Sequence, residues 1–195
     1  VIEDNKIYGS HRSGIEIAGG VSGLTIRNNT IRNNNSTNGG LADPNLKYGN
    51  GILIVRMGSD KTSPTAMGVD GLMIQGNAIY DNEKNGIYMG PINSNISITG
   101  NDFHGNGSDA IQADLTEAYY GGTYAVNDQM SGIVANGNTI SGNTGYGARV
   151  VGTPTSGFTL DAINNWWGCP CGPSGEGPGS GDAVSTNVDY SPWYA

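Results

Sequence analysis

Residues 72–89 and 96–113 decide the fold, because they are two copies of one sequence motif. The first stretch reads LMIQGNAIYDNEKNGIYM and the second reads ISITGNDFHGNGSDAIQA. At equivalent positions, 24 residues apart, each gives an apolar pair, an Asn, an apolar residue, a second Asn, a small residue and another apolar pair. Apolar residues spaced two apart indicate short β-strands with one buried face.

The same motif recurs along most of the chain, which indicates a repeat protein. Its first Asn falls at Asn5, Asn29, Asn77, Asn101, Asn138 and Asn165. Successive members are 24, 48, 24, 37 and 27 residues apart, so the longest intervals carry insertions into a basic unit of 24. The second Asn is at Asn34, Asn82, Asn106 and Asn143.

This period predicts an all-β fold in which each unit winds once around a common axis. Three short strands and their turns fill one coil, and coils stacked at about 4.8 Å pair each strand with its equivalents above and below. The Asn side chains then lie in columns and hydrogen-bond along the stack. We expect these Asn residues, and the Gly before the second apolar pair, to adopt the left-handed backbone that a tight corner needs. Stacked helices are excluded by the period-two pattern, and a leucine-rich repeat would need a Leu-rich consensus.

The coils resemble the repeats of the pectin-lyase-like β-helix superfamily over residues 1 to about 167. The remaining chain resembles a terminal segment of many secreted β-helix proteins, through Asn164-Asn165-Trp166-Trp167-Gly168, Gly181-Asp182-Ala183-Val184 and Ser191-Pro192-Trp193. The resemblance implies a right-handed parallel β-helix, a solenoid of about six coils at residues 1–167, closed by a C-terminal capping segment at residues 168–195. It also implies a secreted or cell-surface protein. An open end would expose core and strand edges, so Trp166, Trp167 and Trp193 are predicted to close the last coil.

Composition narrows the classes of partner. The formal net charge is −8 and only nine residues are Lys or Arg, without a basic stripe, so we expect no nucleic-acid partner. The sequence has no apolar run long enough for a membrane span. It begins at Val1 in the middle of a repeat, so we expect it to be the C-terminal part of a longer protein.

Cys169 and Cys171 are separated only by Pro170. They do not complete a zinc pattern, because no further Cys or nearby His supplies the remaining ligands, and we expect no metal site. A disulfide across one residue would be strained, which favours two thiols in a surface turn.

The insertions predict where a site would lie. They fall between Asn34 and Gly51, between Ile54 and Leu72, and between Ala113 and Ile133, so they flank the sheet formed by the Gly-Ile-x-Ile strands. Long loops on both sides of one sheet would form the walls of a groove. By alternation, the outward residues of that sheet are Glu16, Leu53, Tyr88, Gln112 and Arg149.

The residue types in this groove suit a carbohydrate, because aromatic rings cover sugar C–H faces while amides and acids bond hydroxyls. The candidate ligand-binding residues are Glu16, Tyr88, Gln112, Tyr119, Tyr120 and Tyr124. Packing of the tyrosines onto the scaffold is the competing interpretation. The predicted partners are a polysaccharide or neighbouring protein subunits.

Two functions therefore stay open. The first is an extracellular or cell-surface β-helix module, structural and glycan-binding, without an assignable catalytic site. The alternative is a carbohydrate-active enzyme, either a polysaccharide lyase, a glycoside hydrolase or a uronate epimerase, with Asp109, Asp114 and Arg149 as candidate catalytic residues. No cofactor is expected, apart from Ca²⁺ if the ligand is an acidic polysaccharide.

Overall fold

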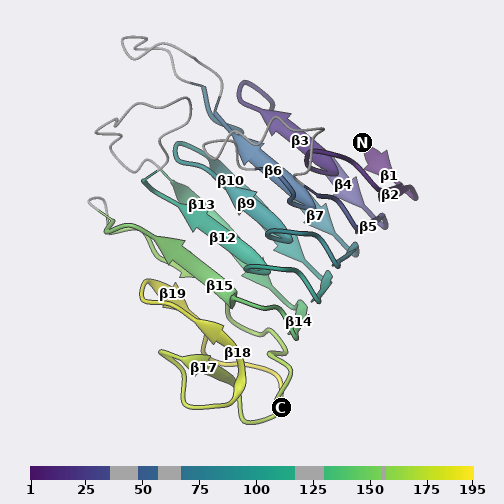
Figure 1. The fold of residues 1–195 in the computed structure, drawn as a ribbon. Helices are drawn as coiled ribbons and strands as arrows, with labels where there is room; N and C mark the ends of the chain where they lie inside the picture. The colour runs from purple at the N-terminus through teal and green to yellow at the C-terminus, as the bar shows by residue number, and fades with distance from the viewer. Residues whose placement is uncertain (36–47, 57–66, 117–129, 155–156) are drawn as a thin grey trace.

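A computed structural model describes residues 1–35, 48–56, 67–116, 130–154 and 157–195. From β1 to β16 the chain stacks its strands in regular order, and three sheets run along the stack (Figure 1). At the C-terminal end, β18 lies between β15 and β17. All strand pairs are parallel. In the described part of the chain there is no helix.

The three sheets, named A, B and C here, take one strand each from successive coils. Sheet A contains β1 (Ile2–Glu3), β4 (Thr25–Arg27), β7 (Met73–Gln75), β10 (Ser94–Thr99), β13 (Ser131–Asn136), β16 (Leu160–Asp161) and β19 (Val188–Asp189). Sheet B contains β2 (Lys6–Tyr8), β5 (Thr30–Arg32), β8 (Ala78–Tyr80), β11 (Asp102–His104) and β14 (Thr139–Ser141). Sheet C contains β3 (Ile15–Ala18), β6 (Ile52–Val55), β9 (Ile87–Met89), β12 (Ile111–Asp114), β15 (Tyr146–Val151), β18 (Gly181–Val184) and β17 (Pro173–Gly175).

The register places equivalent residues of successive coils beside one another. In sheet A, Ile26 pairs with Ile74 and Ile74 with Ile98. These side chains are fully buried in one apolar cluster that runs through the stack. The predicted parallel β-helix of like residues piled on like is therefore confirmed.

The turn between sheets A and B carries an unbroken column of amides. Oδ1 of Asn101 accepts hydrogen bonds from the backbone N–H and the Nδ2 of Asn77, both at 2.9 Å. Asn138 does the same for Asn101, and Asn165 for Asn138. Nδ2 of each buried member also donates to a backbone carbonyl of the neighbouring coil, as Asn101 does to Ile74 O at 2.9 Å. The predicted single column is confirmed.

A second column lies at the turn between sheets B and C. Asn34, Asn82, Asn106 and Asn143 each bond to the next in the same manner. The column ends on a carboxylate, because Oδ2 of Asp182 accepts the N–H and the Nδ2 of Asn143 at 3.0 and 2.8 Å.

The left-handed residue of each corner is not the one that the sequence pattern suggested. In the turn between sheets A and B, the residue before the column Asn has positive φ in every coil: Asp4, Asn28, Gly76, Gly100, Gly137 and Asn164. Only Gly and the short polar residues tolerate this conformation well. The column Asn itself is turned inward, where its amide is needed for hydrogen bonds.

The Gly residues before the Gly-Ile-x-Ile strands also have another role than expected. Gly14, Gly51, Gly86 and Gly147 do not have positive φ. A Cβ on Gly86 would lie 2.7 Å from Ala110 O and 2.9 Å from Cδ1 of Phe103. At these four positions Gly serves close packing of the coil and not backbone freedom, and Ala110 holds the equivalent position in one coil.

The C-terminal segment, residues 168–195, continues two of the sheets. β18 pairs with β15 in sheet C, and β19 pairs with β16 in sheet A. Trp167 is fully buried in the main core, and the partly buried Trp193 packs against that core. The boundary at residue 167 and the capping role stay predictions.

The expectation of two free thiols is wrong in this structure, because Cys169 and Cys171 form a disulfide. The backbone N–H of Gly172 donates to Cys169 O at 3.0 Å, which closes a turn over Pro170 and Cys171. The turn brings the two Cα atoms to 5.1 Å, a separation that disulfides commonly span.

Candidate functional site

The outward row of sheet C has the register that the alternation predicts. Glu16 pairs with Leu53, Leu53 with Tyr88, Tyr88 with Gln112, and Gln112 with Arg149. The row is therefore continuous, but its members differ in their access to solvent.

The middle of the row is closed. Leu53 and Tyr88 are 0% and 1% exposed, and with Val55 they form a second apolar cluster on which Tyr48 packs. Alternation sends Tyr88 outward, yet a ligand cannot reach its ring in this arrangement. A groove open along its whole length is absent from the described surface of sheet C.

Asp114 lies at the C-terminal end of β12 and is saturated with donors. Its Oδ2 accepts the hydroxyl of Tyr88 at 2.8 Å, and its Oδ1 accepts the N–H and the hydroxyl of Thr116 at 2.9 and 2.8 Å. The side chain is buried. Asp114 thus links the corner after β12, through Thr116, to the buried Tyr88 in the middle of the row.

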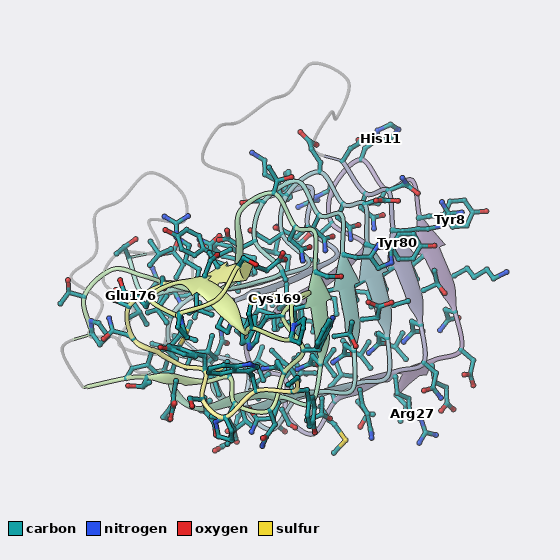
Figure 2. All side chains as sticks on the ribbon, turned by 90° about the horizontal axis from the view of Figure 1, so that it is seen from below. Tyr8, His11, Arg27, Tyr80, Cys169 and Glu176 are labelled. Carbon is teal, nitrogen blue, oxygen red and sulfur yellow. A yellow bond between two sulfur atoms is a disulfide. The ribbon has the colours of Figure 1, made fainter. Side chains whose placement is uncertain are left out.

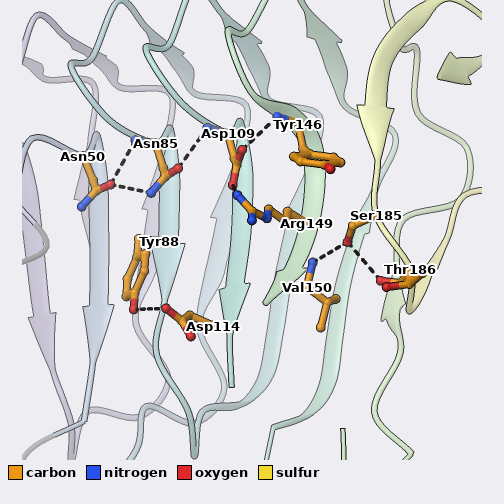
Figure 3. A network of polar contacts seen from close by, with 10 residues as sticks. All are labelled: Asn50, Asn85, Tyr88, Asp109, Asp114, Tyr146, Arg149, Val150, Ser185 and Thr186. Atoms are coloured by element: carbon orange, nitrogen blue, oxygen red, sulfur yellow. Dashed lines mark hydrogen bonds and ion pairs between the residues drawn. The ribbon is translucent and has the colours of Figure 1, made fainter. Parts of the chain in front are cut away.

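Asp109 lies at the opposite end of β12, in a third column that precedes the strands of sheet C (Figure 3). Its N–H donates to Oδ1 of Asn85 at 3.0 Å, and its own Oδ1 accepts the N–H of Tyr146 at 2.8 Å. Its Oδ2 makes no hydrogen bond to the described residues and lies 3.8 Å from Nη1 of Arg149. Figure 3 shows that Asp109 and Asp114 do not face one another.

The environment of Asp109 favours its protonated form. Burial raises the pKa of the Asp109 carboxyl, while the Tyr146 N–H and the Arg149 guanidinium act in the opposite direction and offset only part of this effect. One coil earlier in the same column, Nδ2 of Asn85 donates to Oδ1 of Asn50 at 3.0 Å. The equivalent atom of Asp109, Oδ2, has no hydrogen-bond partner among the described residues.

Arg149 and Gln112 form the more accessible part of the row. Arg149 lies over the ring of Tyr146, with its guanidinium carbon 5.0 Å from the ring centroid. The Arg149 side chain is 42% exposed, and Gln112 and Tyr146 are partly exposed. Of the candidate catalytic residues, the structure therefore brings Asp109 and Arg149 together and leaves Asp114 apart.

Glu16 lies at the other end of the row, beside the closed middle. Its Oε2 lies 3.3 Å from Nη2 of Arg12, and the same guanidinium stacks on and hydrogen-bonds to Tyr48. Glu16 is exposed and separated from Arg149 by three strands of the sheet.

Tyr119, Tyr120 and Tyr124 lie outside the described residues. Tyr146 and Asn85 are parts of the site that were not among the candidate ligand-binding or catalytic residues. The sequence signal for them is a repeat position, the one just before the small residue that precedes each strand of sheet C. In successive coils this position holds Ser13, Asn50, Asn85, Asp109 and Tyr146. No group of three metal-ligating side chains occurs among the described residues.

Sheet B presents a second outward row, Tyr8, Arg32, Tyr80 and His104 (Figure 2). The rings of Tyr80 and His104 stack at 4.6 Å with an interplanar angle of 13°, and Arg32 lies 5.3 Å from the Tyr8 ring centroid. Because these planar groups cover one another along the stack, the row stabilises sheet B more readily than it binds sugar faces.

A family model described as "Right handed beta helix region" matches residues 1–166. The chain belongs to this right-handed β-helix family. The match covers β1 to β16 and gives the handedness of these coils. Comparisons with curated proteins and with solved structures found no match. Among the described residues, no helix long and apolar enough to cross a membrane is present.

Proposed function

We propose that this β-helix is a non-catalytic module of a secreted or cell-surface protein, which acts as a stiff scaffold and binds a glycan or a neighbouring subunit over sheet C. The observation that carries the proposal is that both candidate carboxylates are buried and hydrogen-bonded within the fold. Asp109 belongs to a buried column, and Asp114 holds Tyr88 and Thr116. Both carboxylates are buried, so neither reaches a leaving group.

Acid-assisted glycoside cleavage needs two carboxylates that face one bond, about 5 to 10 Å apart. Asp109 and Asp114 lie at opposite ends of β12 and are 1% and 3% exposed. This arrangement argues against the pair as a hydrolytic site.

The accessible end of the row supports glycan binding. Gln112, Tyr146 and Arg149 offer an amide, a phenol ring and a guanidinium, which suit sugar hydroxyls and C–H faces. The resemblance to pectin-lyase-like proteins points to polysaccharides as the ligand class, with Ca²⁺ as a bridge if the polymer is acidic. The Cys169–Cys171 disulfide supports an oxidising, extracellular compartment.

One observation favours the alternative, a lyase or epimerase that acts on uronates. Asp109 and Arg149 lie 3.8 Å apart, and Arg149 is accessible, so an acid and a cation do meet at the open end of the row. The carboxylate is buried behind the guanidinium, however, and does not reach a substrate that Arg149 would bind.

The test of the first proposal is an activity screen of the full chain against neutral and uronic polysaccharides, with and without Ca²⁺. We expect no new reducing ends and no absorbance from unsaturated products. Release of either product, lost in Asp109→Asn or Arg149→Ala, would establish the enzyme instead.

Binding is tested separately, by affinity electrophoresis in gels that contain the same polysaccharides. We expect Arg149→Ala to weaken retardation about tenfold, because it removes the accessible cation of the site. Arg27→Ala is the matched control, since Arg27 lies on sheet A in an exposed ion pair with Glu3. Equal retardation of both variants and the parent would place any glycan site elsewhere.

A further inference from the structure

The disulfide between Cys169 and Cys171 is the feature of the C-terminal segment that the scaffold role leaves unexplained. Cys171 is exposed and Cys169 is partly exposed, so the bond lies at the surface of the turn (Figure 2). We propose that this disulfide is a thiol–disulfide exchange site, which oxidises an accessible dithiol of a partner molecule.

The disulfide contributes little as a structural link. A cross-link stabilises a fold mainly by restricting the unfolded chain, and the restriction grows with the loop that it closes. Here the loop contains only Pro170. The segment is held by other contacts as well, because Gly172 donates to Cys169 O, Gly181 donates to Gly172 O, and Asp182 donates to Trp167 O.

Trp193 holds the turn from the other side. Its Nε1 donates to Pro170 O at 3.3 Å, and its ring packs so closely on Gly172 that a Cβ there would lie 2.5 Å from Cε2. The turn conformation therefore does not depend on the S–S bond, and the two sulfurs stay close together when that bond is open.

Hydrogen-bond donors are aimed at both sulfurs. The N–H of Cys171 lies 3.1 Å from Cys169 Sγ, and the N–H of Ser180 lies 3.1 Å from Cys171 Sγ. The Ser180 hydroxyl lies 3.3 Å from Cys171 Sγ and 3.5 Å from Cys169 Sγ. A disulfide sulfur is a weak acceptor whereas a thiolate is a strong one, so these donors stabilise the opened bond more than the closed one.

Of the carboxylates that follow the cysteine pair, Glu176 is exposed, and Asp182 is turned onto the amides of Gly142 and Asn143. Donors that stabilise a leaving thiolate speed exchange and make the pair more oxidising.

The reaction balances without a further reagent in a single turnover. A substrate thiolate attacks Sγ of the exposed Cys171, the Cys169–Cys171 bond breaks, and its electron pair goes to Cys169 Sγ. The second substrate thiolate then attacks the substrate sulfur of the mixed disulfide, and the electron pair of that bond goes to Cys171 Sγ. The substrate loses two electrons and becomes a disulfide, while the protein gains two and becomes a dithiol; the two substrate protons pass to solvent or to the cysteines.

The experiment treats the oxidised full chain with dithiothreitol, or with a reduced two-cysteine peptide, and counts alkylated thiols by mass spectrometry over time. We expect one substrate disulfide for each protein dithiol formed. Ser180→Ala should slow the reaction on the order of fivefold to tenfold, because it removes a donor shared by both sulfurs. Ser174→Ala is the matched control, since the Ser174 hydroxyl belongs to the same segment and donates to Gly181 O.

A second measurement keeps the proposal testable if Ser180→Ala disturbs the segment. In Cys169→Ala, the remaining Cys171 should be alkylated with a titration midpoint below the value of about 8.5 for an ordinary cysteine. A midpoint at or above that value would overturn the proposal. So would equal rates in the two serine variants, or a parent chain that keeps two free thiols after oxidation by diamide.

Discussion

The first and third polar columns of this β-helix, one before and one after the strands of sheet B, differ in composition. Between sheets A and B, six successive coils place Asn at one position, from Asn5 to Asn165. Before the strands of sheet C, the equivalent positions are Ser13, Asn50, Asn85, Asp109 and Tyr146. The uniform column meets the same need in every coil, because each coil presents a backbone N–H without a strand partner. The mixed column borders the outward row of sheet C, where neighbouring side chains change from coil to coil.

The difference predicts that the uniform column stabilises the fold and that the mixed column tolerates change. The largest effect should follow from Asn101→Ala. This change leaves the Asn77 N–H without its acceptor, removes one of three acceptors of Asn77 Nδ2, and leaves Ile74 O without the Asn101 donor. At about 1 to 3 kcal/mol for each buried unpaired group, partly relieved by water, we expect a loss of about 3 to 5 kcal/mol.

Urea unfolding followed by circular dichroism measures this loss. Gln75→Ala is the control, because Gln75 is exposed on the outward face of sheet A, and it should change stability by less than about 0.5 kcal/mol. If both variants unfold at the same urea concentration, the column does not hold the coils together.

The next effect concerns close packing beside the mixed column. Gly86→Ala adds a Cβ at 2.7 Å from Ala110 O, 2.9 Å from Phe103 Cδ1 and 3.3 Å from Asn106 Nδ2. Because backbone and a buried ring cannot move apart freely, we expect a loss of about 2 to 3 kcal/mol in the same assay. An unchanged urea midpoint would show that the neighbouring coils can move apart enough to accommodate the added methyl group.

A smaller effect should separate backbone strain from crowding. Gly137 has a φ of +68°, and a methyl group added there would meet no other atom within 4 Å, so Gly137→Ala should cost about 1 to 2 kcal/mol through conformation alone. Gly137→Asn should cost less, because Asn28 and Asn164 hold the same corner in other coils. If the positive φ is the cause, the thermal midpoint should be lowest for Gly137→Ala, higher for Gly137→Asn and highest for the parent. Equal losses in both variants would contradict it.

These examples show what the sequence predicts and what it does not. The columns, the strand register and the outward direction of Tyr88 follow from a fixed period and from alternation, which depend on local geometry. The left-handed residue was assigned one position too late, although Asp4, Asn28 and Gly76 are all types that favour this conformation. Tyr88 is buried in a cluster on which Tyr48 packs from 40 positions away, and periodicity does not contain that contact. The closure of the cysteine pair depends on a turn, whose conformation the spacing alone leaves open.

The smallest expected change is a gain, from Asp109→Asn in the mixed column. The amide supplies the donor toward Asn85 that the carboxylate lacks, and it removes a buried charge, while it loses the attraction of Arg149. We expect the variant to be more stable than the parent near neutral pH by about 1 kcal/mol, the net value of one hydrogen bond.

The pH dependence tests the reason for this gain. The folded pKa of Asp109 is raised above its ordinary value of 3.8, mainly by burial, so the folded chain binds its proton more tightly than the unfolded chain. Among the described residues, the charged group beside Asp109 is Arg149 on β15, and the uncharged Asn85 and Tyr146 lie on either side. The stability that Asp109 contributes through its raised pKa is therefore fully present below pH 3.8, and it is lost as the pH rises through the higher folded pKa. The parent and Asp109→Asn should have their smallest difference in urea midpoint at the acid end of this window and their largest above it. A difference that is constant with pH would mean that Asp109 has the same pKa in the folded and in the unfolded chain, so that the effect of burial is fully offset by Arg149 and the Tyr146 N–H.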